Sequence, residues 1–308
     1  MTSASELASP ETLADSDLLK DLYTDWSEIM ATTPGMTTRL LRSIFDELHQ
    51  TSKEPEDVSY KEEAVGAVAG IWALPKDADT SRVLLYTHGG GFAVGSAASY
   101  RKVAGHVAKA LGVTAFVPDY RLAPENPHPA GLEDCVAVYE ALLERGVRSE
   151  DITSIGDSAG GNLAIATSLA LRDKGLPLPG RVIVFSPWLD MENSGETIVT
   201  NDATDALFSL PLLQGMVAGV LGDTVDPKNP LANPLHADFD GFPKLYISAG
   251  SDEMLLDNAT RLNDAAKSAG VDVTLSVADG QQHIFPVSAG RSAVADETIR
   301  NVADWYRS

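Results

Sequence analysis

The stretch Ile155-Gly156-Asp157-Ser158-Ala159-Gly160-Gly161 decides the fold of this chain. It carries the pattern Gly-x-Ser-x-Gly between an apolar run that indicates a strand and a helix-like run over residues 162–172. A serine on a sharp strand-to-helix turn sits in strained backbone, so its neighbours must be small. The turn exposes the hydroxyl and places the N–H groups of the helix beside it. The motif therefore makes Ser158 a candidate nucleophile, with an ordinary glycine-rich turn as the alternative, and the motifs that accompany it decide between the two.

Short apolar runs alternate with longer helical patterns on both sides of this motif. Two earlier strand-like runs, 58–65 and 68–74, are close enough in sequence to pair antiparallel. The other expected strands are residues 83–87, 114–118, 152–155, 182–185, 245–248 and 273–277, and the helices between them are residues 100–111, 132–146, 162–174, 258–269 and 292–306. This rhythm is typical of a mostly parallel sheet covered by helices on both faces, so the predicted fold class is α/β.

Two segments fall outside the alternation. Residues 15–30 and 37–50 have apolar residues at helical spacing and predict two N-terminal helices. Residues 190–242 contain prolines 211, 227, 230 and 234, an apolar helix-like centre and no strand pattern. We expect residues 1–52 and this insertion to form a helical cap on a catalytic domain of residues 53–308.

The composition limits the class of partner. With 23 Lys and Arg against 44 Asp and Glu, the net charge is −21, which repels nucleic acid and anionic membrane surfaces. The charge favours a neutral or cationic small-molecule partner, but solubility alone is the preferred explanation of so negative a charge. The single cysteine, Cys135, excludes an internal disulfide and favours a reducing, cytoplasmic location. The N-terminus has no signal-peptide pattern, and the longest apolar run, residues 210–221, is too short to span a bilayer.

A serine hydroxyl needs a base to take its proton, and the base needs a carboxylate to orient it. In this architecture the order along the chain is serine, acid and histidine, each after a strand. Two histidines follow Ser158. His236 lies in the insertion with no strand before it, whereas His283 follows the strand at residues 273–277 and is the predicted base.

The acid is expected after the strand at residues 245–248, which ends in Ala249-Gly250-Ser251-Asp252-Glu253. Asp252 comes first and is the predicted acid, with Glu253 as the alternative. Asp257 is expected to begin the next helix instead.

An oxyanion hole is indicated by Thr87-His88-Gly89-Gly90-Gly91-Phe92, directly after the strand at residues 83–87. Glycines allow an exposed backbone whose amides point into a site, and the amide of Ala159 would be a further donor. The alternative is a flexible glycine turn. His88 itself is expected to be structural.

These motifs carry a family resemblance. His88-Gly89-Gly90-Gly91, Gly156-Asp157-Ser158-Ala159-Gly160 and Asp119-Tyr120-Arg121-Leu122-Ala123-Pro124-Glu125 together resemble the hormone-sensitive-lipase-like branch of the α/β-hydrolases. The family continues its acid with Pro-Leu and its base with Gly-Phe, where this chain has Glu253-Met254 and Ile284-Phe285.

The resemblance implies an α/β-hydrolase fold with a helical cap, a triad of Ser158, Asp252 and His283, and an oxyanion hole of Gly90, Gly91 and Ala159. It implies structural roles for Arg121 and Glu125, no cofactor and no metal, and a homodimer formed through an edge strand, here residues 273–277.

The implied reaction is hydrolysis of short-chain acyl esters through an acyl-enzyme. Lactone hydrolysis and amide or peptide cleavage on the same triad are alternatives, as is a non-catalytic ligand-binding receptor, which the presence of His283 disfavours. Apolar residues near the motifs are candidates for the substrate pocket, with ordinary core as the alternative for each: Phe92, Trp188, Leu189, Phe208 and Phe285.

The predicted base sets a pH dependence. His283 must be neutral to take the proton of Ser158, so we expect ester hydrolysis to fall below about pH 6–6.5, close to the ordinary pKa of an imidazole. The kcat/KM profile between about pH 5 and 8 measures this, and a flat profile down to about pH 5 would contradict the assignment.

Overall fold

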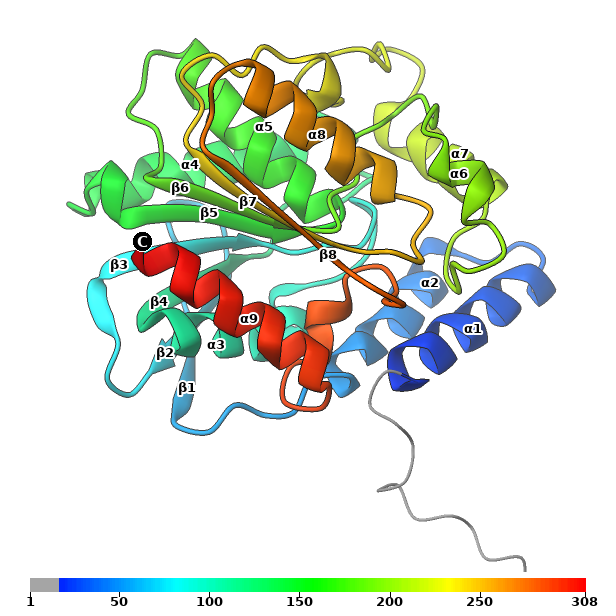
Figure 1. Cartoon of the computed structure of the whole chain (residues 1–308), viewed down its shortest axis with the longest axis horizontal. Helices are drawn as coiled ribbons and strands as arrows, with labels where there is room; N and C mark the ends of the chain where they lie inside the picture. The colour runs from blue at the N-terminus through cyan, green and yellow to red at the C-terminus, as the bar shows by residue number, and fades with distance from the viewer. Residues whose placement is uncertain (1–16) are drawn as a thin grey trace, which may run out of the picture.

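The computed structural model describes residues 17–308. Residues 1–16, which include the first two residues of the predicted N-terminal helix and the region examined for a signal peptide, lie outside the described part. The remaining chain forms one twisted sheet with helices on both faces (Figure 1).

The sheet has eight strands in the order β1-β2-β4-β3-β5-β6-β7-β8. β1 and β2 pair antiparallel, as predicted, and β2 is antiparallel to β4, while every later pairing is parallel. The strands are β1 (Val58–Glu62), β2 (Gly70–Pro75), β3 (Asp79–Thr87), β4 (Val113–Pro118), β5 (Ile152–Asp157), β6 (Arg181–Phe185), β7 (Lys244–Gly250) and β8 (Val273–Ala278). The α/β prediction is therefore confirmed. β3, β5 and β7 extend beyond the ranges that their apolar runs indicated.

Helices cover the sheet in two layers (Figure 1). α3 (Ala97–Leu111) and α9 (Ala293–Arg307) pack together on one face. The other face carries α4 (Ala130–Glu144), α5 (Ala159–Asp173) and α8 (Leu256–Ser268). The central parallel strands β4, β5 and β6 are buried almost throughout, which explains their continuous apolar runs.

The segments outside the alternation gather at one end of the sheet (Figure 1). The N-terminal segment forms α1 (Asp17–Thr32), α2 (Thr38–Phe45) and a 3₁₀ turn at Asp46–Gln50. The insertion forms α6 (Thr197–Thr200), α7 (Leu210–Leu221) and a 3₁₀ turn at Pro234–His236, with no strand, as expected. Their division into a cap and a catalytic domain stays a prediction.

An arginine ties the N-terminal segment to the body of the protein. Arg42 of α2 donates to both carboxylate oxygens of Glu125, at 2.7 and 3.0 Å, and to the carbonyls of Ala93 and Ala123. Arg121, by contrast, binds Asp134 and Glu133 of α4. Arg121 therefore holds the loop after β4 as expected, whereas Glu125 anchors α2.

Two surface features bear on earlier expectations. β8 is the edge strand of the sheet and Val277 on it is 44% exposed, but the homodimer stays a prediction. In the described part of the chain, no helix combines the length and the apolar character needed to cross a membrane.

The start of α5 crosses the end of β3 so closely that only glycine fits at residue 160. A Cβ there would lie 2.0 Å from the carbonyl oxygen of Thr87 and 2.4 Å from that of His88. We therefore expect Gly160→Ala to lower the free energy of unfolding by about 1–3 kcal/mol or more.

Gly219 of α7 is the matched control, because a Cβ there meets no atom within 4 Å. Gly219→Ala should stabilise the protein by up to about 1 kcal/mol through helix propensity. Thermal or urea unfolding of both variants measures the difference, and equal stabilities would contradict the proposed close crossing.

Candidate active site

Ser158 occupies the sharp turn that the sequence predicts. It follows β5 directly, precedes the first residue of α5, and has φ 51° and ψ −122°. Such backbone costs on the order of 1–3 kcal/mol and persists only where its surroundings hold it. Here the Ser158 amide donates to the Phe185 carbonyl and the Ser158 carbonyl accepts from the Trp188 amide, both at 2.9 Å. β6 and the loop after it therefore hold the strained turn.

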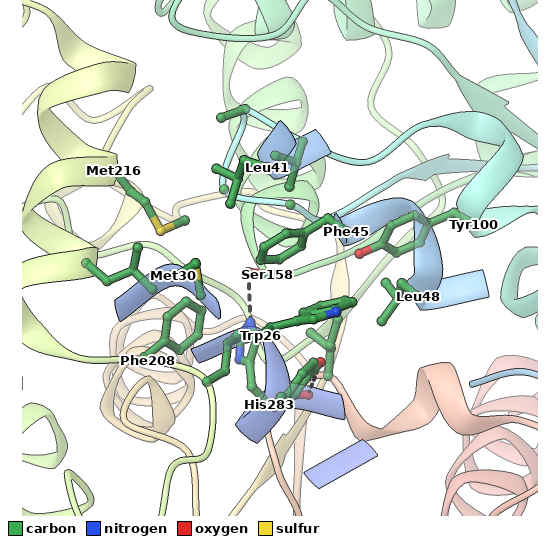
Figure 2. A pocket seen from close by; sticks show the side chains of 18 residues that line it. Trp26, Met30, Leu41, Phe45, Leu48, Tyr100, Ser158, Phe208, Met216 and His283 are labelled. Atoms are coloured by element: carbon green, nitrogen blue, oxygen red, sulfur yellow. Dashed lines mark hydrogen bonds between the residues drawn. The ribbon is translucent and has the colours of Figure 1, made fainter. Parts of the chain in front are cut away.

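Three side chains from three loops form a continuous hydrogen-bonded chain. His283 Nε2 lies 2.8 Å from Ser158 Oγ, the contact drawn as a dashed line in Figure 2, and His283 Nδ1 lies 2.5 Å from Glu253 Oε2. All three residues are buried. With Nδ1 donating to the carboxylate, Nε2 can accept the proton of the serine.

The prediction of Asp252 as the acid is wrong, because Glu253 is the carboxylate that reaches His283. β7 runs on to Gly250, and the chain then turns so that Asp252 is partly exposed and accepts from Ser251 Oγ at 3.0 Å. Glu253 is fully buried and its second oxygen accepts from the Gly250 amide at 2.9 Å. The carboxylate is thus held at both oxygens.

A signal for Glu253 was present in the sequence. The family resemblance places Pro-Leu after the acid, and Glu253 is followed by Met254-Leu255, which retains the leucine. Asp252 is followed by Glu253-Met254, which retains neither residue. The choice of Asp252 relied on its being the first carboxylate after the apolar run at residues 245–248. That criterion was weaker, because the apolar run does not show where the strand ends.

The loop that carries His283 is held by contacts that the sequence did not indicate. Ile284 has φ 51°, and its amide donates to Ser186 Oγ at 2.9 Å. Tyr23 of α1 donates its hydroxyl to the carbonyl of His283 at 3.0 Å. This last contact joins residues 260 positions apart, so no local pattern could have shown it.

The expected oxyanion donors lie around Ser158. Gly90 and Gly91 have φ of 111° and 59°, which favour glycine, and both line the same pocket as Ser158 and His283. The Gly90 carbonyl accepts from the amides of Ala93 and Val94, which fixes the loop. Within residues 17–308, the amides of Gly90 and Gly91 donate to no protein acceptor. Ala159, the first residue of α5, adjoins the nucleophile.

Two buried polar residues, Asp157 and His88, hold the glycine loop in place. Asp157 accepts from the hydroxyls of Tyr86 at 3.1 Å and Tyr100 at 3.0 Å. Burial raises the pKa of the Asp157 carboxyl to about 7, although the two hydroxyls oppose the rise. His88 stacks on Tyr120, and burial lowers the pKa of its imidazole to about 4, so it is neutral at physiological pH. Both side chains brace the glycine run.

The pocket beside Ser158 is apolar and small, with a cavity volume of about 60 Å³, room for a few water molecules. Figure 2 shows the side chains that surround it. Most of the lining comes from two segments: Tyr23, Trp26, Met30, Leu41, Phe45 and Leu48 from the N-terminal segment, and Leu207, Phe208, Leu212 and Met216 from the insertion.

Of the predicted pocket residues, only Phe208 lines this cavity. The prediction is wrong for the other four, which are core residues. Phe92 and Trp188 pack on each other with ring centroids 5.8 Å apart, and Leu189 and Phe285 are buried in the two hydrophobic clusters. The error arose because the N-terminal helices, far away in sequence, supply the wall that these residues were expected to form.

Comparison with known proteins agrees with this geometry. The model of a family described as having the alpha/beta hydrolase fold matches residues 84–287. An acetyl-hydrolase of Streptomyces hygroscopicus is 41% identical over 221 residues, 72% of this chain and 73% of its own. An esterase of Acinetobacter venetianus is 31% identical over 274 residues, 89% of this chain and 90% of its own.

Solved structures give the same result over almost the whole chain. The crystal structure of an esterase from the bacterial hormone-sensitive lipase family has a TM-score of 0.90 at 36% identity and covers 98% of both chains. A hormone-sensitive lipase from a metagenome library has a TM-score of 0.87 at 33% identity, covering 96% of this chain and 99% of its own.

Proposed function

Because this chain belongs to the hormone-sensitive-lipase-like branch of the α/β-hydrolases and is a carboxylic ester hydrolase, we propose that it cleaves short-chain acyl esters through Ser158, His283 and Glu253. The observation that carries the proposal is the hydrogen-bonded chain of these three side chains, two of which, Ser158 and His283, line an apolar pocket. The same chain argues against a non-catalytic receptor, which needs no base beside its serine.

In the first half of the reaction, Ser158 Oγ attacks the ester carbonyl while His283 Nε2 takes its proton. Glu253 stabilises the imidazolium that forms and holds the ring in place. His283 then gives the proton to the leaving alcohol, and an acyl group remains on Ser158. In the second half, water attacks the acyl-enzyme while His283 takes its proton; the bond to Ser158 Oγ then breaks, His283 returns the proton to Oγ, and the carboxylic acid leaves.

Negative charge develops on the carbonyl oxygen during both attacks. Gly90 and Gly91 line the same pocket as Ser158, and Ala159 follows it in the chain, so their amides are the donors we propose for this oxyanion. The start of α5 adds its positive dipole end at the same point. Each donor of this kind contributes about 2.7–4 kcal/mol to lowering the barrier in related chemistry.

The shape of the pocket supports short acyl groups. Large apolar side chains line it on both sides and its volume is small, so an acetyl or propionyl group fits with less rearrangement than a long chain. The pocket walls come from α1, α2 and the insertion, and we propose that these segments together act as the cap. The relative named an acetyl-hydrolase is consistent with this size.

Substitution of each carboxylate distinguishes the acid from its neighbour. We expect Glu253→Gln to lower kcat by about 10³–10⁴-fold, because a neutral amide leaves the imidazolium without its counter-charge. Asp252→Asn should change kcat by less than about 10-fold, because Asp252 does not contact His283. Hydrolysis of p-nitrophenyl acetate measures both, with Ser158→Ala as the inactive reference. Equal losses in the two variants would contradict the assignment.

The acyl preference depends on Met216. Its methyl group lies over Gly91, where an added Cβ would come within 2.0 Å of Met216 Cε. We expect the wild-type protein to prefer acetyl to octanoyl esters, and Met216→Ala to raise the ratio of octanoyl to acetyl kcat/KM by about 10-fold, roughly what one or two methylenes contribute in an apolar pocket.

Gln214 is the control, because it is exposed on the same helix and does not line the pocket. Gln214→Ala should leave the ratio at its wild-type value. An unchanged ratio in Met216→Ala would show that the acyl chain lies elsewhere.

A further inference from the structure

Side chains of the insertion hold the loop that carries Glu253 by hydrogen bonds. Four consecutive carbonyls of this loop accept hydrogen bonds from side chains between residues 197 and 204 of the insertion. These bonds run from Asn201 Nδ2 to Ser251 and Glu253 at 2.9 Å each, from Thr204 Oγ1 to Asp252 at 3.0 Å, and from Thr197 Oγ1 to Met254 at 2.8 Å. The backbone next to the catalytic carboxylate is thus set by the insertion rather than by the sheet alone.

The buried carboxylate of Asp205 adds further hydrogen bonds between the insertion and this loop. One of its oxygens accepts from the amide of Met254, the residue after Glu253, at 2.7 Å. The other accepts from the amides of Leu207 at 2.8 Å and Phe208 at 2.9 Å. The residue is only 8% exposed. A single carboxylate therefore fastens the turn before α7 to the loop of the acid.

The residues beside Asp205 contact the loop of the base. The Phe208 ring stands edge-on to the His283 ring with centroids 4.8 Å apart. Gln282, next to His283, accepts from the Ala206 amide at 2.8 Å and donates to the Thr204 carbonyl at 3.0 Å. Movement of the turn around Asp205 would displace both the acid and the base.

Asp205 also acts on His283 through its charge. Burial raises the pKa of the Asp205 carboxyl, while the amides of Phe208 and Met254 and the charge of His283 oppose the rise. Glu253 binds the imidazole from the loop after β7. The charge of His283 also opposes the rise in the pKa of Asp157 at the end of β5, and Tyr23 of α1 binds the backbone carbonyl of His283. Asp205 is the carboxylate that the insertion adds to this set.

We infer that Asp205 is a positioning residue for the Glu253–His283 pair, by which the insertion sets both the geometry of the pair and the charge around it. The inference rests on the proposed function, because it assigns Asp205 a part in the same reaction. Asp205 itself does not touch Ser158 or the reacting atoms and acts through the two loops that it joins.

The test is Asp205→Asn, assayed by p-nitrophenyl acetate hydrolysis between about pH 5 and 8. Asparagine keeps the shape but removes the charge and one acceptor, so we expect kcat to fall by about 10–100-fold with KM nearly unchanged. The acid limb of kcat/KM should move to lower pH, because the imidazolium loses a nearby carboxylate charge. A merely structural role would not move this limb.

Asp190 gives a matched control. It is another buried carboxylate of the insertion, 2% exposed, and it binds the amides of Glu192 and Ser194 and the guanidinium of Arg261 at 2.7 Å. In the described residues none of its side-chain hydrogen bonds reaches the loops of Glu253 or His283. Asp190→Asn should lower the melting temperature but leave kcat within about 2-fold of wild type and the acid limb of kcat/KM at its wild-type pH.

Asp205→Glu separates charge from position and remains informative if Asp205→Asn does not fold. It keeps the charge but shifts the carboxylate, so kcat should fall while the acid limb stays at its wild-type pH. The inference is overturned if Asp205→Asn has the wild-type kcat and its acid limb lies at the wild-type pH. It is also overturned if the acid limb moves in Asp205→Glu, or if kcat falls as much in Asp190→Asn as in Asp205→Asn.

A second assay does not depend on ester turnover: the rate at which a fluorophosphonate labels Ser158, measured across the same pH range, reports the same acid limb. If the wild type labels but cleaves no ester, the proposed function fails while the role of Asp205 is still decided by the labelling rates.

Discussion

The architecture depends on the strained backbone of Ser158. Its positive φ can be held only if β5 ends there, α5 begins there, and the neighbouring β6 supplies partners for both the amide and the carbonyl. The turn also forces α5 against the end of β3, where Gly160 lies against the carbonyls of Thr87 and His88. That contact places the glycine run at residues 89–91 next to Ser158. One local constraint therefore brings together two motifs that are about 65 residues apart.

Glu253 and His283 come from the loops after β7 and β8, beyond β6 in the sheet, and of the two only His283 contacts Ser158. β7 and β8 are parallel neighbours, so their carboxyl ends lie side by side and their following loops share the Glu253–His283 contact. Contacts from outside the two loops add to those within and between them. Tyr23 of α1 binds the His283 carbonyl, and the insertion binds four carbonyls of the loop after β7. The segments that close the pocket are thus the same ones that brace the catalytic groups.

Because the same segments line the pocket and hold the loops of Glu253 and His283, substitutions in them differ in what they change. The sheet fixes where the strands end, and therefore which side chains meet, while α1, α2 and the insertion fix the room left beside Ser158. Residues such as Met216 can vary the pocket without touching the sheet. Residues such as Asp205 and Tyr23 cannot vary freely, because they bind the loops of the acid and the base.

The sequence by itself determined the sheet and pointed to Ser158, His283 and the glycine run at residues 89–91 as the candidate site. Each of these is encoded locally, by apolar periodicity or by a motif whose residues are neighbours in the chain. The choice between Asp252 and Glu253 was decided by the tertiary structure, because it depends on where β7 stops and which way the chain turns afterwards. The pocket walls were decided there too. Tyr23, Trp26 and Met216 meet only after folding, across separations that no periodic pattern in the sequence can encode.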